Sequence, residues 1–501
     1  MAKDDYIKRV IQQGDEGSRL LAAICAPTPR TNGLVRILEE GMNGIAVLNV
    51  PKDHFAVVHS SGGNPRYRDA TRHAASLVDR LVEQADYVGA IPVALADVID
   101  ANNGDKLLIE SIGSAIANRA DYHGVSIING ELAILGNRIN PEVQANVSGT
   151  MLSLIPKSQS GRLMRREYTV SHSNDVIQII GRNRVEYALF DPKGKYIYVN
   201  SDGVGTKLEF YERTKEYAKA VWDFFAMTWD DKVKLGAKTV VTASVCETKG
   251  TIPYDKIKER ACSVAEELKS VSIMQREEVG QRIQSYRPSV PAFNLSGSVV
   301  SVIDEERFKN PLKPSPGEYL IAVRSPKPNP RSNGITDLRR ILCEMLGNNY
   351  HNREEGKEYL EYAAQPSFIF APYFEKLLAE GLATSFFHLS GGSFNGKLAR
   401  PLRNNGLYIE LEDIFKPDYR VENLVRHDNM PLELAYAKWP MGNEAFFSTP
   451  TPARAMLYAR NLGLEANLVG QLKVTKDDKT GITLLGIKGS DGEDIYYSGK
   501  E

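Results

Sequence analysis

The sequence predicts an α/β (α+β) protein in which one domain is duplicated and an unrelated domain follows. Strand-like and helix-like segments alternate along the chain, and segments of the N-terminal third return 141 to 148 positions later in the same order. The matching pairs are Asn146–Ile155 with Asn294–Ile303, Val125–Ile127 with Val271–Ile273, Gly89–Ala90 with Gly236–Ala237, and Pro51–Gly62 with Pro192–Gly203. Four matches in one order argue for duplication of a unit that covers about 20–157 and 170–305.

Both repeats have the same predicted order of elements. An apolar strand leads to a glycine turn, and a long helix follows at 69–84 or 214–234. A strand then follows the Gly-Ala pair, as in 91–96, and a second helix covers 109–122 or 254–269. A buried strand and a final strand with the Asn-x-Ser-Gly segment complete the repeat. Such alternation is typical of helices packed in layers on sheets.

Two segments have the composition of linkers. Residues 157–162 are polar and contain glycine, and residues 309–317 are rich in proline. The sequence after the second linker resembles neither repeat, and we expect it to form a separate α/β domain. The predicted domains are therefore 1–160, 161–308 and 318–501.

The composition excludes several classes of protein. With 42% hydrophobic and 25% charged residues the chain is ordinary for a globular protein, and its net charge of −1 predicts neither nucleic acid nor a membrane as partner. No run of eighteen apolar residues predicts a membrane span, and Met1–Asp5 lacks the apolar segment of a signal peptide. The four cysteines form no Cys-x-x-Cys pair, so we expect neither disulfides nor structural zinc. We expect the protein to be cytoplasmic.

The segment 202–208, Asp-Gly-Val-Gly-Thr-Lys-Leu, is the most informative in the chain. Its glycines allow a phosphate to approach the backbone closely, and exposed N–H groups can bind it. Lys207 adds a positive charge, and Asp202 is of the type that ligates Mg²⁺ beside phosphates. The segment matches neither the Walker motif nor the dinucleotide-binding motif. A simple turn with glycine at positive φ is the alternative.

Three segments together resemble aminoimidazole ribonucleotide synthetase (phosphoribosylformylglycinamidine cyclo-ligase). The first is the Asp-Gly-Val-Gly-Thr-Lys-Leu loop at 202–208. The second is the Ser-Asn-Gly turn that opens a helix at 331–339, and the third is the His-Leu-Ser-Gly-Gly loop at 388–401. They follow one another in the order that the family has. The segment 438–443 is weakly similar to a late turn of the same family.

The resemblance implies an ATP-dependent ligase of purine biosynthesis. The family phosphorylates the amide oxygen of formylglycinamidine ribonucleotide with ATP and Mg²⁺ and closes the imidazole ring. It is usually a homodimer in which two N-terminal domains form a joint barrel. The duplicated domain would supply both halves of that barrel within one chain, as an intrachain pseudo-dimer with one C-terminal domain. The sequence leaves open whether the chain forms a further homodimer and whether the first repeat holds a second nucleotide.

The resemblance also implies site residues. The residues expected to act in catalysis are Lys207, Asp202 and His388. The residues expected to bind ATP are Asp202, Gly203, Val204, Gly205, Thr206, Lys207, Asn129, Gly130 and Glu131. The acids expected to hold Mg²⁺ are Asp202, Asp230, Asp231, Asp97 and Glu131. The residues expected to bind the ribose phosphate are Arg331, Ser332, Asn333, Gly334, Ser390, Gly391, Gly392, Asn395 and Lys397. Among the basic residues of the second loop, Lys397 or Arg400 is expected to assist by its charge.

The two repeats differ from the family in complementary ways. The second repeat keeps Asp202, where the first has Ser61; the first keeps Asp97 and Asn129-Gly130-Glu131, where the second has Ser244 and Gln275-Arg276-Glu277. An arginine in place of glycine would block a close backbone approach. We therefore expect one composite ATP site, with the phosphate loop from the second repeat and acids from the first. Simpler roles for the acids are a solvated helix face for Asp230 and Asp231, and a turn cap for Asp97.

Two other functions are compatible with these residues. A degenerate relative could bind nucleotide without catalysis, as Arg276 and Arg331 at replaced positions would allow. A relative could also transfer phosphate to another acceptor, as thiamine-monophosphate kinases and selenophosphate synthetases do. Cys25 lies in an apolar run and does not have the surroundings of a reactive thiol, which argues against selenophosphate synthesis. The Ser-Asn-Gly and Ser-Gly-Gly loops favour the cyclo-ligase over the kinase.

Overall fold

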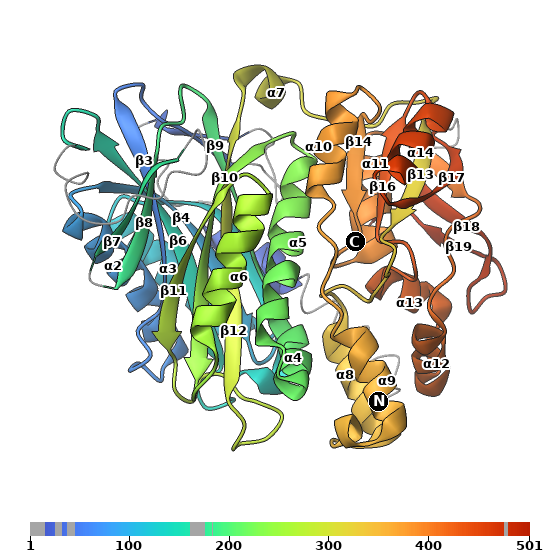
Figure 1. Ribbon diagram of the computed structural model, residues 1–501, viewed down its shortest axis with the longest axis horizontal. Helices are drawn as coiled ribbons and strands as arrows, with labels where there is room; N and C mark the ends of the chain where they lie inside the picture. Colours follow the sequence, from blue (N-terminus) through green and yellow to red (C-terminus); the bar gives the residue numbers. More distant parts are fainter. Residues whose placement is uncertain are drawn as a thin grey trace. The chain divides into compact units, whose positions relative to one another are not determined.

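The computed structural model describes residues 16–25, 33–37, 46–160, 176–182, 184–474 and 479–500. The chain divides into two compact units, shown in Figure 1. Unit 1 contains Met1–Phe224 and Ala237–Lys309, and unit 2 contains Phe225–Gly236 and Asn310–Glu501. The last two residues of the linker predicted at 157–162 lie outside the described residues.

Unit 1 contains two six-stranded sheets. The first has the strand order β5-β4-β6-β3-β8-β7. Its strands β4 and β5 are parallel and joined by helix α3, and the other neighbours are antiparallel. The strands are β3 (His54–Gly62), β4 (Ile91–Ala101), β5 (Ser126–Ile134), β6 (Ala145–Pro156), β7 (Val176–Arg182) and β8 (Val185–Phe190).

The second sheet has the order β1-β2-β9-β12-β10-β11. Its strands are β1 (Val35–Ile37), β2 (Ala46–Asn49), β9 (Tyr196–Gly203), β10 (Lys238–Lys249), β11 (Val271–Glu278) and β12 (Ala292–Ile303). The order β11-β10-β12-β9 corresponds to β5-β4-β6-β3, with the same parallel and antiparallel pairs. The two pairs of edge strands are exchanged: β7 and β8 precede β9 in the chain but join β3, whereas β2 precedes β3 but joins β9.

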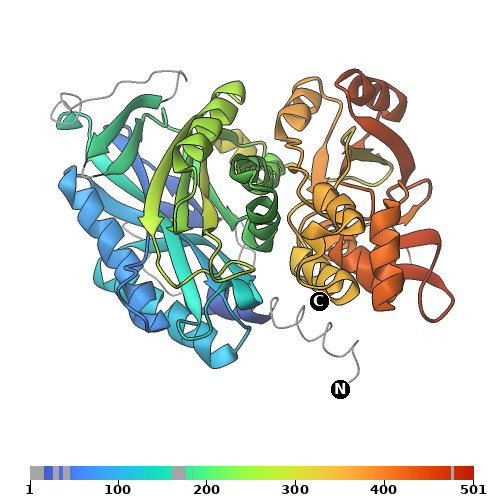
Figure 2. The same cartoon turned by 60° about the horizontal axis from the view of Figure 1, so that its bottom comes forward.

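The two sheets pack against each other through one apolar core, to which β3, β4 and β6 contribute from the first sheet and β9, β10 and β12 from the second. Helices α2 (Ala70–Tyr87) and α3 (Lys106–Tyr122) cover the other face of the first sheet, and α6 (Tyr254–Glu267) packs beside β11. These helices can be followed in Figure 2. The remaining helices of unit 1 are α4 (Leu208–Thr214), the first part of α5 (Ala220–Val233) and α7 (Glu305–Lys309).

The predicted α/β class is confirmed, and most helices lie where the sequence placed them. One prediction was wrong in extent. The helix expected at 214–234 is divided, because α4 ends at Thr214 and Lys215 takes the left-handed conformation with φ of +60°. Helix α5 begins only at Ala220. Left-handed residues commonly end helices, and the chain resumes a helical path after a short 3₁₀ turn at Tyr217–Lys219.

Unit 2 contains a four-stranded antiparallel sheet, β14-β16-β13-β17, and a three-stranded mixed sheet, β15-β18-β19. Its strands are β13 (Tyr319–Arg324), β14 (Ser385–His388), β15 (Tyr408–Leu411), β16 (Ala445–Thr449), β17 (Glu465–Gln471), β18 (Gly481–Lys488) and β19 (Asp494–Tyr497). Its helices are α8 (Ile335–Leu346), α9 (Glu354–Ala363), α10 (Ala371–Ala379), α11 (Arg400–Asn404), α12 (Tyr419–Asp428), α13 (Leu432–Lys438) and α14 (Pro452–Asn461). Among the described residues of the whole chain, no helix has the length and apolarity needed to cross a membrane.

Candidate functional site

The Asp202 loop of unit 1 lies where the second sheet meets the first. Strand β9 ends at Gly203, and Asp202 pairs with Gly297 of β12. The N–H of Ser201, the residue before Asp202 in β9, donates to Asn129 Oδ1 over 3.1 Å, so the strand that leads into the loop of the second repeat contacts a strand of the first. Glu131 follows Asn129 by two positions in β5 and therefore lies on the same face of that strand. The structure thus brings the Asp202 loop together with the strand that carries Asn129 and Glu131.

Lys207 does not lie where the sequence predicted. Its side chain is fully buried, and its Nζ lies 2.7 Å from Asp223 Oδ1. The Tyr211 hydroxyl donates a hydrogen bond to the other carboxylate oxygen, Asp223 Oδ2. Within 202–208 only Asp202 keeps partial exposure. The ammonium group is already neutralised by a buried carboxylate, so it could contact a phosphate only by giving up this ion pair.

Asp97 and Asp100 lie on opposite faces of β4. Asp97 falls between Leu95 and Ile99, which pack under the helices in the same apolar cluster as Cys25. Burial raises the pKa of the Cys25 thiol, and the charge of Asp97 adds to this effect. Burial raises the pKa of Asp97 to about 7. The expected contact of Asp97 with the Asp202 loop is therefore not made, because this side chain faces the helices.

Asp100 is the acid that faces the loop, and the sequence reasoning missed it. A Cβ built on Gly203 would lie 3.9 Å from Asp100 Oδ1. This buried oxygen has no hydrogen-bond partner, whereas Oδ2 accepts from Asn294 Nδ2 over 2.8 Å. Burial raises the pKa of Asp100 to about 6. The alternation of side chains along β4 could have indicated that Asp97 and Asp100 point to opposite faces.

Glu247 is the counterpart of Asp100 in the other sheet. Asp100 pairs with Asn146 across β4 and β6, and Glu247 pairs with Asn294 across β10 and β12. Glu247 Oε2 accepts from Asn146 Nδ2 over 2.5 Å and from Asn294 Nδ2 over 2.9 Å. Burial raises the pKa of Glu247 to about 8, and the nearby Asp100 contributes. The repeated asparagines thus connect two buried carboxyl groups from different repeats.

The strand register corrects the expected match between the repeats in β5 and β11. Asp97 and Ser244 occupy the same place, opposite Gly149 and Gly297 respectively. Gly130 pairs with Asp97, but the residue that pairs with Ser244 is Met274 and not Arg276. A register shift in β5 between the partners of Leu95 and Ala96 adds one residue to that strand. The rest of the difference lies before the shift, because Leu95 pairs with a residue 32 positions on, Ile127, whereas Thr242 pairs with one 30 positions on, Ser272. Arg276 is exposed and does not take the place of Gly130.

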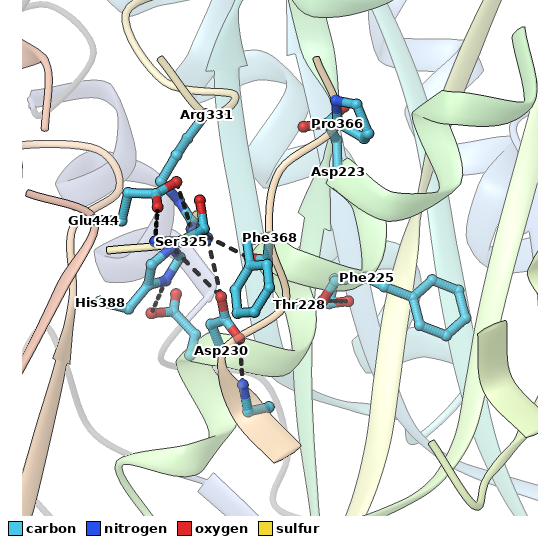
Figure 3. Close-up of polar contacts among 12 residues, drawn as sticks. Asp223, Phe225, Thr228, Asp230, Ser325, Arg331, Pro366, Phe368, His388 and Glu444 are labelled. Atoms are coloured by element: carbon cyan, nitrogen blue, oxygen red, sulfur yellow. Dashed lines mark hydrogen bonds and ion pairs between the residues drawn. The ribbon is translucent and has the colours of Figure 1, made fainter. Parts of the chain in front are cut away.

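In unit 2, Arg331 is the centre of a buried network, shown in Figure 3. Its Nη2 lies 2.9 Å from Asp230 Oδ2 and 2.7 Å from His388 Nε2, and its Nη1 donates to the carbonyl of Phe368 over 3.2 Å. Asp230 Oδ1 also accepts from the N–H of Ala371 over 2.8 Å. Arg331 is 1% exposed, so the structure places it inside the domain and not at a surface where a substrate phosphate could bind.

His388 is buried in the same network. Burial and the charge of Arg331 lower its pKa to about 3, so the ring is neutral near pH 7. Its Nδ1 lies 3.7 Å from Asp231 Oδ1. Burial alone would raise the pKa of Asp231, but Lys397, Lys234 and His388 hold it well below the usual value. A ring with this pKa accepts protons poorly, which disfavours the catalytic role expected of His388.

The two predicted substrate loops of unit 2 do come together. A Cβ on Gly391 would lie 3.5 Å from Asn333 Nδ2, and Lys397 Nζ lies 3.2 Å from Asp231 Oδ2. Gly391 and Gly392 are exposed, whereas Ser332 and Ser390 are largely buried. Lys397 and Asn395 belong to a π-helical turn, Phe394–Ala399, a rare conformation that is frequent at functional sites.

Trp439 holds both loops in place. Its Nε1 donates to the carbonyl of Gly334 over 3.1 Å, and its own carbonyl accepts from Ser393 Oγ over 2.8 Å. A Cβ on Gly334 would lie 2.4 Å from Trp439 Nε1, so only glycine fits beside the indole. Gly334 and Ser393 both have positive φ. The two loops therefore depend on a residue that sequence reasoning assigned no role.

The predicted set of five metal-binding acids is not assembled. In the part of the chain that the structure describes, no group of three or more His, Cys, Asp and Glu residues is placed to hold a metal ion. Asp230 and Asp231 interact with basic side chains of unit 2, and Asp97 faces the helices of unit 1. In unit 1, Asp202 and Asp100 are carboxylates of a kind that suits Mg²⁺, but Asp100 faces Gly203, whereas Asp202, one position earlier in β9, points to the opposite face of that strand.

Comparisons with known proteins connect the chain to one family. Residues 42–152 match the family described as AIR synthase related protein, N-terminal domain. The chain is 25% identical over 258 residues to a phosphoribosylformylglycinamidine cyclo-ligase of Pyrococcus horikoshii, a match that covers 51% of this chain and 72% of the relative. It is 26% identical over 259 residues to that of Thermococcus kodakarensis, with the same coverage.

Among solved structures, a thiamine-monophosphate kinase from Stenotrophomonas maltophilia aligns with a TM-score of 0.41 and 14% identity, over 64% of this chain and 93% of that chain. A likeness at this level supports no conclusion about function. The sequence matches and the two related sheets agree with the predicted family. Residues 42–152 are thus similar to the N-terminal domain of the AIR synthase related proteins, and about half of the chain is similar to the phosphoribosylformylglycinamidine cyclo-ligases.

Proposed function

We propose that this protein is an ATP-dependent cyclo-ligase that converts formylglycinamidine ribonucleotide to aminoimidazole ribonucleotide, ADP and phosphate. The observation that carries the proposal is the contact of Ser201, the residue before the Asp202 loop, with Asn129 of the other repeat. It joins the intact phosphate-loop sequence to the strand with Glu131, as the composite ATP site requires. The names of the sequence relatives support the same reaction. The exchanged edge strands support an intrachain pseudo-dimer.

Unit 1 is proposed to bind ATP and Mg²⁺. Asp202 offers carboxylate oxygens to the metal ion, Asp100 adds negative charge beside Gly203, and Asn129 holds Ser201, which precedes the loop. ATP supplies the phosphoryl group that turns the amide oxygen of the substrate into a leaving group. Attack of the neighbouring nitrogen on the amide carbon closes the ring and releases phosphate. Positioning and charge neutralisation supply most of the rate in such phosphoryl transfers.

Unit 2 is proposed to bind the ribose phosphate. Asn333, the exposed glycines Gly391 and Gly392, and Lys397 surround the position where the two loops meet. Lys397 supplies the positive charge and is oriented by Asp231. Arg331 and His388 act as positioning residues, because they are buried and bonded to each other behind Asp231.

The test is to incubate the purified protein with formylglycinamidine ribonucleotide, ATP and Mg²⁺ and to measure aminoimidazole ribonucleotide and ADP. We expect both products in equal amounts, and neither with Asp202→Ala. ATP turnover without the imidazole product would show another acceptor. Nucleotide binding with no turnover of any kind would show a non-catalytic relative.

A further inference from the structure

We propose that Arg80 acts as an internal cation in the first repeat and takes the place of a divalent ion at the counterpart of the Asp202 site. The chain would then bind nucleotide at only one of its two related positions. This inference rests on the proposed ATP function for the stoichiometry of nucleotide, whereas the role of Arg80 is independent of it.

The strand register shows which residues correspond to the Asp202 loop. Ser61 pairs with Gly149 of β6 as Asp202 pairs with Gly297 of β12. The backbone continues in the same way: the N–H of Gly63 donates to the carbonyl of Val147 over 2.9 Å, and that of Val204 donates to the carbonyl of Leu295 over 3.0 Å. The segment 61–63 is therefore the structural counterpart of 202–204.

Arg80 occupies this counterpart. Its Nη1 donates to the carbonyl oxygens of Gly62 and Gly63 over 2.8 and 3.1 Å, and its Nη2 lies 2.7 Å from Glu277 Oε1. Ser61 Oγ donates to the same Glu277 oxygen over 3.2 Å. The first repeat has no acid at position 61, and Glu277 of β11 supplies the carboxylate at this place instead. The positive charge that balances Glu277 comes from Arg80 of the same chain.

The backbone of this loop has few groups left for a phosphate. The N–H of Gly63 is bonded to Val147 just as that of Val204 is bonded to Leu295, and the N–H of Asn64 donates to Ser76 Oγ over 2.8 Å. A Cβ on Gly63 would lie 2.6 Å from His73 Cε1, so the imidazole packs directly on the glycine. A phosphate would have to displace both Arg80 and His73 to approach this backbone closely.

The atoms around the guanidinium suit a hard cation. Within the described part of the chain, the atoms that accept hydrogen bonds from the guanidinium are a carboxylate oxygen of Glu277 and the carbonyl oxygens of Gly62 and Gly63. Glu247 Oε1 is buried without a hydrogen-bond partner and would lie 3.1 Å from a Cβ on Gly62. Oxygen sets of this kind bind Ca²⁺, Mg²⁺ and Mn²⁺. Removal of the guanidinium would leave these oxygens without a cation.

The first test counts bound Mn²⁺ by electron paramagnetic resonance, with the metal alone and the full chain. We expect Arg80→Ala to bind one more Mn²⁺ per chain than the wild type. The matched control is Arg72→Ala on the same helix, whose side chain is exposed, and it should bind as the wild type does. An unchanged number in Arg80→Ala would overturn the proposal.

Folding of the variant is followed by its melting temperature. If Arg80→Ala is less stable, Mn²⁺ should raise its Tm more than that of the wild type, and an equal rise would contradict the proposal. Arg80→Lys keeps a positive charge at the site and should bind no additional Mn²⁺. Binding of an additional Mn²⁺ by Arg80→Lys would contradict the proposal that the positive charge at this position keeps a divalent ion out.

The second test is calorimetric titration of the wild type with a non-hydrolysable ATP analogue and Mg²⁺. We expect one nucleotide per chain, and two would overturn the inference. Absence of any binding would refute the proposed ATP function and the nucleotide stoichiometry, whereas the Mn²⁺ count would still decide the role of Arg80. The two failures can therefore be told apart.

Discussion

Arg331 Nη2 donates a hydrogen bond to His388 Nε2 over 2.7 Å, and this contact determines the tautomer of a buried imidazole. A guanidinium has no acceptor atom, so Nε2 must accept, and the ring proton lies on Nδ1, which faces Asp231 at 3.7 Å. Asp231 in turn contacts Lys397. A chain of four side chains thus connects the buried interior of unit 2 to the lysine proposed to bind substrate.

Replacement of Arg331 by Met should destabilise the protein by about 3–5 kcal/mol, because it leaves the buried carboxylate of Asp230 without its cation. Urea unfolding measures the change. Arg331→Met combined with Asp230→Asn should regain part of the loss, because the buried charge is then removed. The exposed Arg454→Met is the matched control and should change the stability by less than about 0.5 kcal/mol. A wild-type stability for Arg331→Met would contradict the buried ion pair.

Glu247→Gln should change how stability depends on pH. The pKa of Glu247 is raised from 4.5 to about 8 in the folded protein, so the folded state holds a proton that the unfolded state has released. Its contribution to stability is complete below pH 4.5 and is lost as the pH rises towards 8. Between pH 4.5 and pH 8, the free energy of unfolding of Glu247→Gln should therefore fall less than that of the wild type.

The measurement is urea unfolding at several pH values between 4.5 and 8.5. The exposed Glu267→Gln serves as control and should follow the wild-type curve. Asp100, whose pKa is also raised, contributes in the same direction and remains in all three proteins. Parallel curves for the wild type and Glu247→Gln would mean that this carboxyl group does not hold its proton in the folded state.

Lys207→Met separates a structural role of this lysine from a direct role in binding phosphate. The structure predicts a loss of about 3–5 kcal/mol, because Asp223 would be left buried and unpaired by Nζ. Lys207→Met with Asp223→Asn should recover stability. The exposed Lys256→Met is the control. If Lys207→Met keeps full stability but loses affinity for ATP, the prediction is wrong. The main partner of Lys207 would then be the nucleotide and not Asp223.

Alanine at Asp202 and at Glu131 should each weaken nucleotide binding by at least about tenfold, or about 1.4 kcal/mol, because the composite site takes groups from both repeats. Asp100→Asn should lower the affinity for the Mg²⁺ complex, because it removes the unpartnered carboxylate beside Gly203. Calorimetric titration measures all three, with the exposed Asp121→Ala as control. Normal ATP binding by Glu131→Ala would refute the composite site.

Much of the fold follows from patterns along the chain. Helices α2, α3 and α6 and the alternation of strands were predicted from apolar periodicity, because that signal is local. The division between α4 and α5 was not, since it depends on the left-handed conformation of a single lysine, Lys215. The exchange of edge strands between the sheets also has no local signal, because pairing partners are chosen by the packing of the whole core.

The sequence by itself determined the α/β class, the related repeats, the Asp202 loop and the two loops of unit 2 that approach each other at Asn333 and Gly391. Only the tertiary structure decided which acids and bases are paired. Arg80 and Glu277 are 197 positions apart, and Arg331 and Asp230 are 101 apart. Such contacts depend on strand register and side-chain direction. The pairing register of β5 and β11 excludes Arg276 from the place of Gly130, and the two opposite faces of β4 separate Asp97 from Asp100.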